Sequence, residues 1–298
     1  MKKNHTVRKR RQVVCLRHEK RGGKLMKQWE EYRIPAEEVR RISRIPITCL
    51  EDQTSVFSRM ALEMAEKIED NNRQGKRTVF IIPFGPTGQY PVFVDLVNTR
   101  RISLKKVWLI TMDDWLDSDG GLVGLDNIHS LRRKMNQVLY SKIDKGLVMP
   151  EEQRIYPDPG WLERIPDLIE ALGGVDICFA GFGINGHLGF NEPADVSPEE
   201  FAKLPTRVVR ISETTRTIKA STGVNGAMED IPFYGITVGM REMLCADKVS
   251  VYCFRDWHSG AIRRAGCGTV SSGFPASLLQ NHPNAAIVCS PNAIAPCY

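Results

Sequence analysis

Short apolar runs alternate with stretches of helical periodicity along most of this chain. The runs at 78–82, 106–111 and 175–180 are largely apolar, which is typical of strands buried on both faces. Further strands are expected at 207–211, 234–238, 248–254 and 285–289. Helices are expected where apolar residues recur three and four positions apart, namely from Thr54 to about residue 71, after Pro91, up to about residue 140, and at 161–172, 212–220, 259–265 and 277–280.

This alternation predicts an α/β protein with a doubly wound, mostly parallel sheet and helices on both faces, a three-layer αβα arrangement. No linker-like segment divides residues 26–298, so we expect them to form a single domain. Residues 141–160 carry no clear periodicity and are expected to be irregular.

Polar groups follow two of the predicted inner strands. After 175–180, the chain reads Gly-Phe-Gly-Ile-Asn-Gly-His-Leu-Gly-Phe-Asn-Glu-Pro, which places Asn185, His187 and Glu192 near the strand end. The run 106–111 is followed by Asp113 and Asp114. Because the carboxyl ends of parallel strands meet at one edge of a sheet, where ligands bind, these groups are expected to share a site. The structural alternatives are a glycine-rich turn with an incidental histidine, and acids that cap a turn or helix.

A third polar turn, Pro-Phe-Gly-Pro-Thr-Gly-Gln-Tyr-Pro at 83–91, follows the run 78–82. Its Gly85, Thr87 and Gly88 precede a predicted helix, whose free N–H groups suit an anion such as phosphate. The turn is not a P-loop, because no Gly-Lys-Ser/Thr follows.

The charge is distributed unevenly along the chain. Residues 1–25 hold ten Lys or Arg and one acid, whereas the remainder holds 31 basic and 34 acidic residues. The body is therefore mildly acidic, and no nucleic-acid partner is expected for it. We expect the basic segment to be a disordered extension, with a polyanion-binding or targeting arm as the alternative.

The eight cysteines include no Cys-x-x-Cys pair, and several lie in apolar runs. This pattern indicates buried, reduced thiols rather than a zinc site or a disulfide scaffold, and hence a cytoplasmic protein. No apolar run approaches the roughly 20 residues that span a bilayer, so no membrane association is expected. The sequence leaves a homo-oligomer open.

The polar groups exclude several classes of chemistry. There is no nucleophile elbow, no complete dinucleotide fingerprint and no cluster with metal-ligand spacing. What remains is general acid–base catalysis on a small phosphorylated molecule. In such a site a carboxylate moves a proton between neighbouring carbons, and a histidine moves one on and off an oxygen.

The motif at 181–193 resembles that of the glucosamine-6-phosphate deaminase/isomerase family, and the resemblance runs from about residue 78 to about residue 288. Its Asn-Glu-Pro ending distinguishes it from the related 6-phosphogluconolactonases. Supporting matches are Met-Asp-Asp-Trp at 112–115, the turn at 85–88, Thr-Thr-Arg at 214–216, Gly-Ile-Thr-Val-Gly at 235–239 and Pro-Ala-Ser-Leu-Leu at 275–279.

This resemblance implies a reaction of glucosamine 6-phosphate and water that yields fructose 6-phosphate and ammonia without a metal or organic cofactor. Asp113 would move a proton between C2 and C1 of the open-chain sugar. His187 would open the pyranose ring, and Glu192 would orient His187 and balance its charge. The 6-phosphate would be held by Gly85, Thr87, Gly88 and Arg216.

Two positions depart from the pattern of the family's deaminases. Asn185 stands where they usually have Asp, and an amide cannot offset a positive charge on His187. Phe233 stands where they carry a phosphate-binding Lys, a role that Lys219 or Arg241 would have to fill. These departures make a non-catalytic sugar-phosphate sensor an alternative to a deaminase. A lactone hydrolase of the 6-phosphogluconolactonase kind is a second alternative within the same fold, against which the Asn-Glu-Pro ending speaks.

Overall fold

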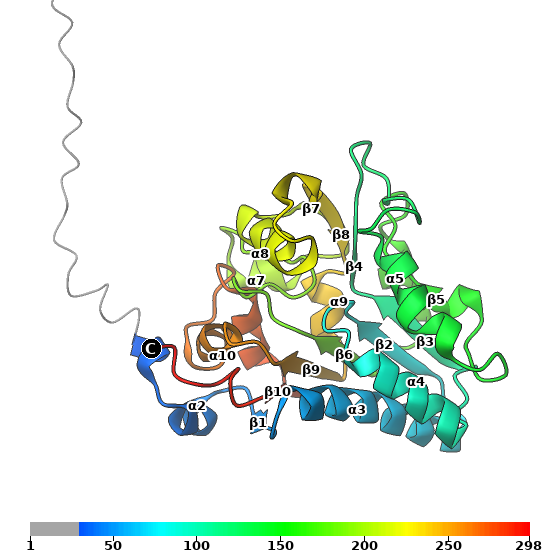
Figure 1. Cartoon of the computed structure of the whole chain (residues 1–298), viewed down its shortest axis with the longest axis horizontal. Coiled ribbons are helices and arrows are strands. Elements are labelled where there is room, and N and C mark those ends of the chain that lie inside the picture. The colour runs from blue at the N-terminus through cyan, green and yellow to red at the C-terminus, as the bar shows by residue number, and fades with distance from the viewer. Residues whose placement is uncertain (1–29) are drawn as a thin grey trace, which may run out of the picture. The chain divides into compact units, whose positions relative to one another are not determined.

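The computed structural model describes residues 30–298, so the basic segment 1–25 lies outside the described residues. Seven parallel strands form the main sheet, in the order β1-β10-β9-β6-β2-β3-β5 (Figure 1). Their bounds are β1 Ile47–Cys49, β2 Thr78–Ile82, β3 Val107–Thr111, β5 Arg154–Ile155, β6 Ile177–Ala180, β9 Lys248–Cys253 and β10 Ala285–Cys289. The predicted parallel α/β sheet is thus confirmed.

The apolar runs form inner strands because both of their faces are covered. Every residue of β2 and β6 is buried. Successive side chains of a strand point to opposite faces. In β2, Val79 and Ile81 accordingly join one hydrophobic cluster, while Phe80 and Ile82 join another.

Helices pack on each face of the main sheet. The helices α3 (Gln53–Arg73), α4 (Gln89–Arg100) and α5 (Leu131–Val138) contribute to the cluster around Phe80. The opposite cluster takes residues from α2 (Ala36–Ile42), α6 (Arg164–Ala171), α7 (Pro198–Ala202), α9 (Met240–Leu244) and α10 (His258–Cys267). Figure 1 shows α3 and α4 along the lower side of the sheet, away from α10. This arrangement is the expected three-layer one.

A second, antiparallel sheet stands beside the main one, with the order β4-β8-β7. It consists of β4 (Asp113–Trp115), β7 (Arg207–Arg210) and β8 (Tyr234–Thr237). The sequence indicated the strands at 207–211 and 234–238, but not that they leave the main sheet. Val209 of β7 packs on a third cluster with Trp115 and Phe190, which gives this sheet an apolar contact of its own.

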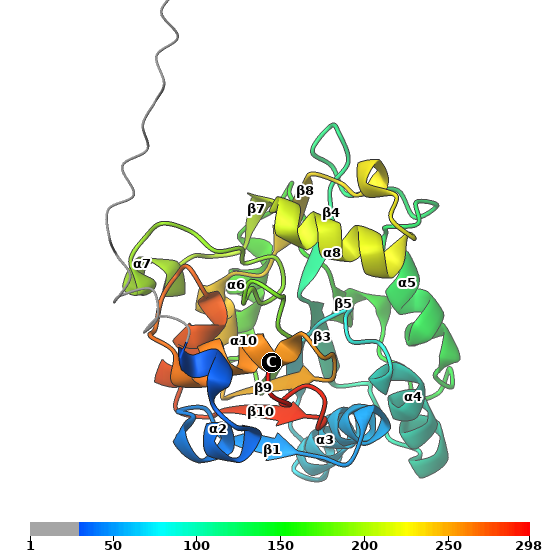
Figure 2. The ribbon, with the colours of Figure 1, turned by 60° about the vertical axis from the view of Figure 1, so that its left-hand side comes forward.

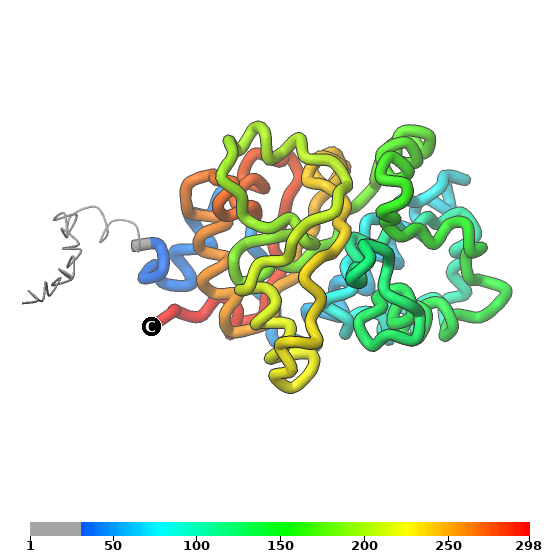
Figure 3. Tube along the Cα trace, turned by 90° about the horizontal axis from the view of Figure 1, so that it is seen from above, coloured from blue at the N-terminus to red at the C-terminus, as the bar shows by residue number. Residues whose placement is uncertain are grey.

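The helix α8 (Glu213–Gly223) connects this sheet to the site described below. Ser212 caps its N-terminus by accepting a hydrogen bond from the Thr215 N–H. Figure 2 shows α8 across the top of the molecule, and Figure 3 shows the yellow segment with α8 and β8 crossing its middle. The helix therefore lies over the carboxyl ends of the main strands.

Several short elements differ from the expectation. The segment 141–160 includes the 3₁₀ turns η2 (Tyr140–Lys142) and η3 (Glu151–Gln153) and the edge strand β5, which is too short to show a periodicity. The expected helix at 277–280 is the 3₁₀ helix η5 (Pro275–Asn281), and two further 3₁₀ turns are η1 (Glu30–Arg33) and η4 (Met228–Asp230). No helix within residues 30–298 is long and apolar enough to cross a membrane.

Candidate active site

A pocket of about 950 Å³, counting the part that opens to solvent, lies at the carboxyl ends of the inner strands. Segments that follow β2, β3, β6 and β9 all contribute to its lining. Gly85, Asp113 and His187, one residue from each predicted polar stretch, line it together. The parallel sheet brings them together because its strands all end at the same edge.

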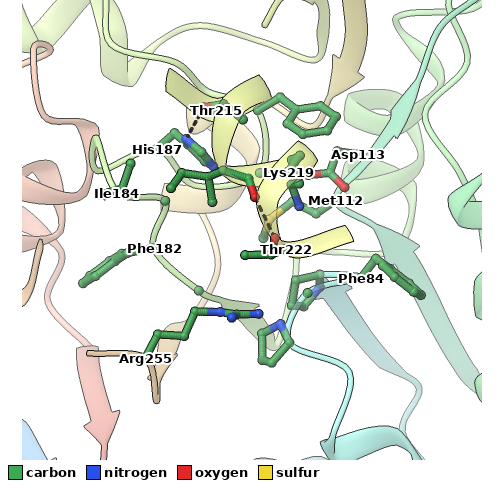
Figure 4. A pocket seen from close by; sticks show the side chains of 18 of the residues that line it. Phe84, Met112, Asp113, Phe182, Ile184, His187, Thr215, Lys219, Thr222 and Arg255 are labelled. Atoms are coloured by element: carbon green, nitrogen blue, oxygen red, sulfur yellow. Dashed lines mark hydrogen bonds between the residues drawn. The ribbon is translucent and has the colours of Figure 1, made fainter. Parts of the chain in front are cut away.

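One face of α8 forms a wall of this pocket. Thr215, Ile218, Lys219 and Thr222 line it, a spacing of three, four and seven residues that places them on one side of a helix. Figure 4 shows this helix above the pocket with Asp113, His187 and Lys219 close to it. Of these wall residues, only Thr215, within the Thr-Thr-Arg match, and Lys219 were singled out from the sequence, although the spacing identifies all four.

Asp113 is the pocket carboxylate with the perturbed acidity. Its side chain is 9% exposed. Burial raises its pKa from 3.8 to about 7, the nearby Lys219 lowers it, and Asp114 raises it further. A carboxyl with a pKa near neutrality exchanges protons readily at physiological pH, which suits a general base.

Asp114 has a different, structural task. Its Oδ1 accepts hydrogen bonds from the N–H groups of Trp115 at 2.8 Å and of Leu131 at 3.0 Å. Its Oδ2 lies 3.4 Å from Nε of Arg132. Asp114 thus ties β4 to the start of α5 and does not line the pocket.

His187 is oriented by a chain of two side chains. The amide Nδ2 of Asn185 donates to Oε2 of Glu192 at 2.7 Å, and Asn185 Oδ1 lies 2.7 Å from Nδ1 of His187. A carboxylate accepts but does not donate, so Glu192 determines which way the amide faces. The amide oxygen then requires a proton on Nδ1, which leaves Nε2 of His187 unprotonated.

The electrostatic balance at His187 favours the neutral ring. Burial lowers its pKa to about 4, while Glu192 raises it and Lys219 lowers it. Glu192 Oε2 lies 3.8 Å from Nδ1, beyond a direct hydrogen bond. Glu192 is itself held by the hydroxyl of Ser212, which donates to its Oε2 at 2.9 Å. Glu192 therefore reaches His187 through Asn185, at the N-terminus of α8.

Close packing around the His187 ring requires glycine at position 183. A Cβ at Gly183 would lie 2.1 Å from the ring carbon Cε1 of His187. The Gly183 N–H donates to the His187 carbonyl at 2.9 Å, which closes the turn beneath the ring. The glycine-rich motif thus lets the backbone pass directly under the imidazole.

Of the four residues expected to bind phosphate, only one lines the pocket. Gly85 lines the pocket, whereas Thr87 is exposed and Gly88 packs at the start of α4 against the Phe57 ring, and neither is a lining residue. Arg216 belongs to α8, but its side chain is buried and does not line the pocket either. For these residues, phosphate binding stays a prediction.

Two cations, Lys219 and Arg255, line the pocket although neither was predicted as a site residue from the sequence. Lys219 was considered only as a substitute for a missing lysine, and Arg255 was not considered. Arg255 comes two residues after β9, so the rule that pointed to Asp113 also points to it. Arg241, the other proposed substitute, pairs with Glu242 at 2.8 Å and does not line the pocket.

The described residues offer no group of three or more His, Cys, Asp or Glu arranged to hold a metal ion. The titratable side chains that line the pocket include the Asp113 carboxyl, the imidazoles of His187 and His258, and the two cations.

Comparisons with known proteins identify relatives of this chain. No protein-family model matches it. It is 36% identical over 209 residues to the glucosamine-6-phosphate deaminase of Lysinibacillus sphaericus, covering 68% of this chain and 81% of that protein. It is 30% identical over 212 residues to the glucosamine-6-phosphate deaminase of Lachnoclostridium phytofermentans, covering 68% and 82%.

Solved structures show the same fold. A monomeric glucosamine-6-phosphate deaminase, described as a missing link of the NagB superfamily, aligns with a TM-score of 0.72 at 23% identity, over 83% of this chain and 98% of that one. The 6-phosphogluconolactonase of Trypanosoma brucei aligns with a TM-score of 0.60 at 16% identity, over 83% and 96%. The sequence relatives and the shared fold together place this chain in the glucosamine-6-phosphate deaminase family of the NagB superfamily.

Proposed function

We propose that this protein converts an amino-sugar 6-phosphate, glucosamine 6-phosphate or an epimer, and water to a ketose 6-phosphate and ammonia. The observation that carries the proposal is the pairing of Asp113 and His187 in one pocket. One has a pKa near 7 and the other has an unprotonated Nε2. The deaminase relatives act on the same class of sugar phosphate, as their names state.

The first step is the opening of the sugar ring. Nε2 of His187 takes the proton of the C1 hydroxyl, and the C1–O5 bond breaks as the C1 carbonyl forms. The proton then passes to O5. A histidine held neutral by burial performs this step as a base, without a carboxylate at position 185.

Asp113 performs the second step. Its carboxylate removes the C2 proton, which gives an enolamine between C1 and C2, and returns a proton to C1 to give an imine at C2. Water adds to the imine carbon, and the C2–N bond then breaks. This step releases ammonia and forms the C2 carbonyl of the ketose. Lys219, close enough to lower the pKa of Asp113, helps to hold the carboxylate ionised.

The test is an assay of ammonia release from glucosamine 6-phosphate and galactosamine 6-phosphate with the purified full chain. We expect release with at least one of them, and none above background with Asp113→Asn. No release from either sugar by the wild-type protein would refute the proposal.

Hydrolysis of 6-phosphogluconolactone is the second candidate, because lactonases such as that of Trypanosoma brucei share the fold. A lactone needs an attacking water and no proton transfer at C2. Lactone turnover that survives Asp113→Asn, without ammonia release from either amino sugar, would favour this reaction.

A further inference from the structure

We propose that Lys219 and Arg255 bind the 6-phosphate of the substrate between them, and that Arg216 fastens α8 in place instead of contacting the phosphate. This inference rests on the proposed function, because it assigns the phosphate end of that substrate. This pair of cations would also supply the charge of the lysine that the family resemblance implies at position 233, where this chain has Phe.

The two cations reach the pocket from different elements. Lys219 projects from the pocket face of α8, and Arg255 follows β9 at the sheet edge. Figure 4 shows Arg255 entering from the side opposite α8. Both side chains keep exposed surface, although Lys219 is closely surrounded by protein atoms, because that surface opens into the pocket. An anion in the pocket would therefore meet a positive group from each side.

Neither charge is neutralised by an ion pair within residues 30–298. The guanidinium carbon of Arg255 lies 5.2 Å from the ring centroid of Phe254, and the Lys219 ammonium has no carboxylate within 4.0 Å. Burial chiefly lowers the pKa of Lys219, the carboxylate of Asp113 raises it, and the charge of Arg255 lowers it. A phosphate dianion placed between two cations that repel each other is stabilised by both.

A third cation adds to the positive potential at the pocket edge. The ammonium of Lys134 lies 5.6 Å from the centroid of Phe84, a lining residue. Burial lowers the pKa of Lys134, and Lys219 lowers it further, so the two ammonium groups are electrostatically coupled. This cluster favours an anionic group over a neutral hydroxyl.

Lys219 and Arg255 line the same pocket as Asp113 and His187, the proposed acid–base pair. Lys219 is close enough to Asp113 and His187 to shift the pKa of both. Arg255 enters the pocket from the side opposite α8 (Figure 4) and is close enough to Lys219 to lower its pKa. C1 and C2 would face Asp113, and the 6-phosphate would reach the gap between Lys219 and Arg255.

Arg216 is fully engaged by the protein. Its Nη2 donates to the carbonyls of Ile231 at 3.0 Å and Met228 at 3.1 Å, and its Nη1 lies 3.0 Å from both carboxylate oxygens of Glu213. Its guanidinium carbon lies 3.9 Å from the centroid of the Phe233 ring. Binding phosphate would break these contacts, whereas leaving them intact anchors α8 to η4.

The experiment measures the affinity of the full chain for glucitol 6-phosphate, an open-chain alcohol that has no carbonyl and cannot react. Calorimetry compares the wild type with Lys219→Met and Arg255→Met. Matched controls are Lys203→Met and Arg210→Met, which remove exposed cations that do not line the pocket. We expect each pocket variant to weaken binding by about tenfold or more, and each control by less than about twofold.

Arg216→Met should unfold at a lower temperature but, while folded, bind glucitol 6-phosphate within about twofold of the wild type. If it does not fold, Arg216→Lys serves instead, since it keeps the charge and loses the planar fork. The inference is overturned if affinity falls with Arg216 and is unchanged in Lys219→Met and Arg255→Met.

This outcome is separate from that of the proposed reaction. Binding that depends on Lys219 and Arg255 without ammonia release would keep the phosphate site and refute the deaminase. Ammonia release with an unchanged KM in both pocket variants would support the deaminase and refute the phosphate site.

Discussion

Replacing Asp113 by Asn should abolish turnover and yet make the protein more stable at neutral and alkaline pH. The reason is that the folded protein buries a carboxylate that accepts no hydrogen bond within residues 30–298 and is only partly compensated by the charge of Lys219. Asparagine has nearly the same shape and carries no charge, so the variant removes the cost of burying the anion.

The size of the effect follows from the shift in acidity. The pKa of Asp113 rises from 3.8 in the unfolded chain to about 7 in the folded protein, and each unit corresponds to about 1.4 kcal/mol. The difference in the free energy of unfolding between Asp113→Asn and the wild type should thus reach about 4 kcal/mol above pH 7 as an upper bound. The attraction to Lys219 is already included in this shift.

The direction of the pKa shift determines the pH range in which the stability of the wild type changes. Because the folded pKa lies above the unfolded one, the protonated carboxyl stabilises the wild type fully below pH 4, and this contribution is lost as the pH rises towards 7. Urea unfolding of both proteins at several pH values between 4 and 8 measures the difference directly. Other titrating groups are common to both proteins and cancel.

A matched control is Asp176→Asn at the opposite end of β6. Asp176 accepts from the Val79 N–H at 2.8 Å and pairs with Lys67 at 2.9 Å, so its loss should lower stability at neutral pH. A difference between Asp113→Asn and the wild type that stays constant from pH 4 to pH 8 would refute the reasoning about Asp113.

Three further predictions concern the reacting pair. The kcat/KM of the wild type for the amino-sugar phosphate should rise as the pH passes about 7, because Asp113 must lose its proton to act as the base; a flat profile from pH 6 to pH 8 would contradict this. Asn185→Asp should raise the pKa of His187 from about 4, because it places a carboxylate 2.7 Å from Nδ1, and NMR titration of the imidazole would detect the change or its absence. Glu192→Gln should allow the Asn185 amide to turn over and should shift His187 towards the other tautomer, lowering kcat more than about tenfold; ¹⁵N shifts of the ring report the tautomer, and an unchanged Nδ1–H would argue against the relay.

Much of the fold could be read from the chain because inner strands of a parallel sheet are apolar on both faces. The runs at 78–82 and 175–180 therefore predict β2 and β6 without knowledge of their partners. The same rule predicts that groups after these strands meet, and Gly85, Asp113 and His187 do line one pocket. The antiparallel sheet was missed because pairing depends on distant segments, here β4 with β8 across more than a hundred residues.

What the sequence determined by itself was thus the α/β class, the edge at which polar side chains gather, and the types of side chain available there. Tertiary structure decided what each of them does. Arg216 and Lys219 lie three residues apart on α8, yet packing against η4 and Phe233 buries one while the other faces the pocket. The pKa of Asp113 and the tautomer of His187 were likewise undetermined, because both depend on burial and on partners that folding alone brings within a few ångströms.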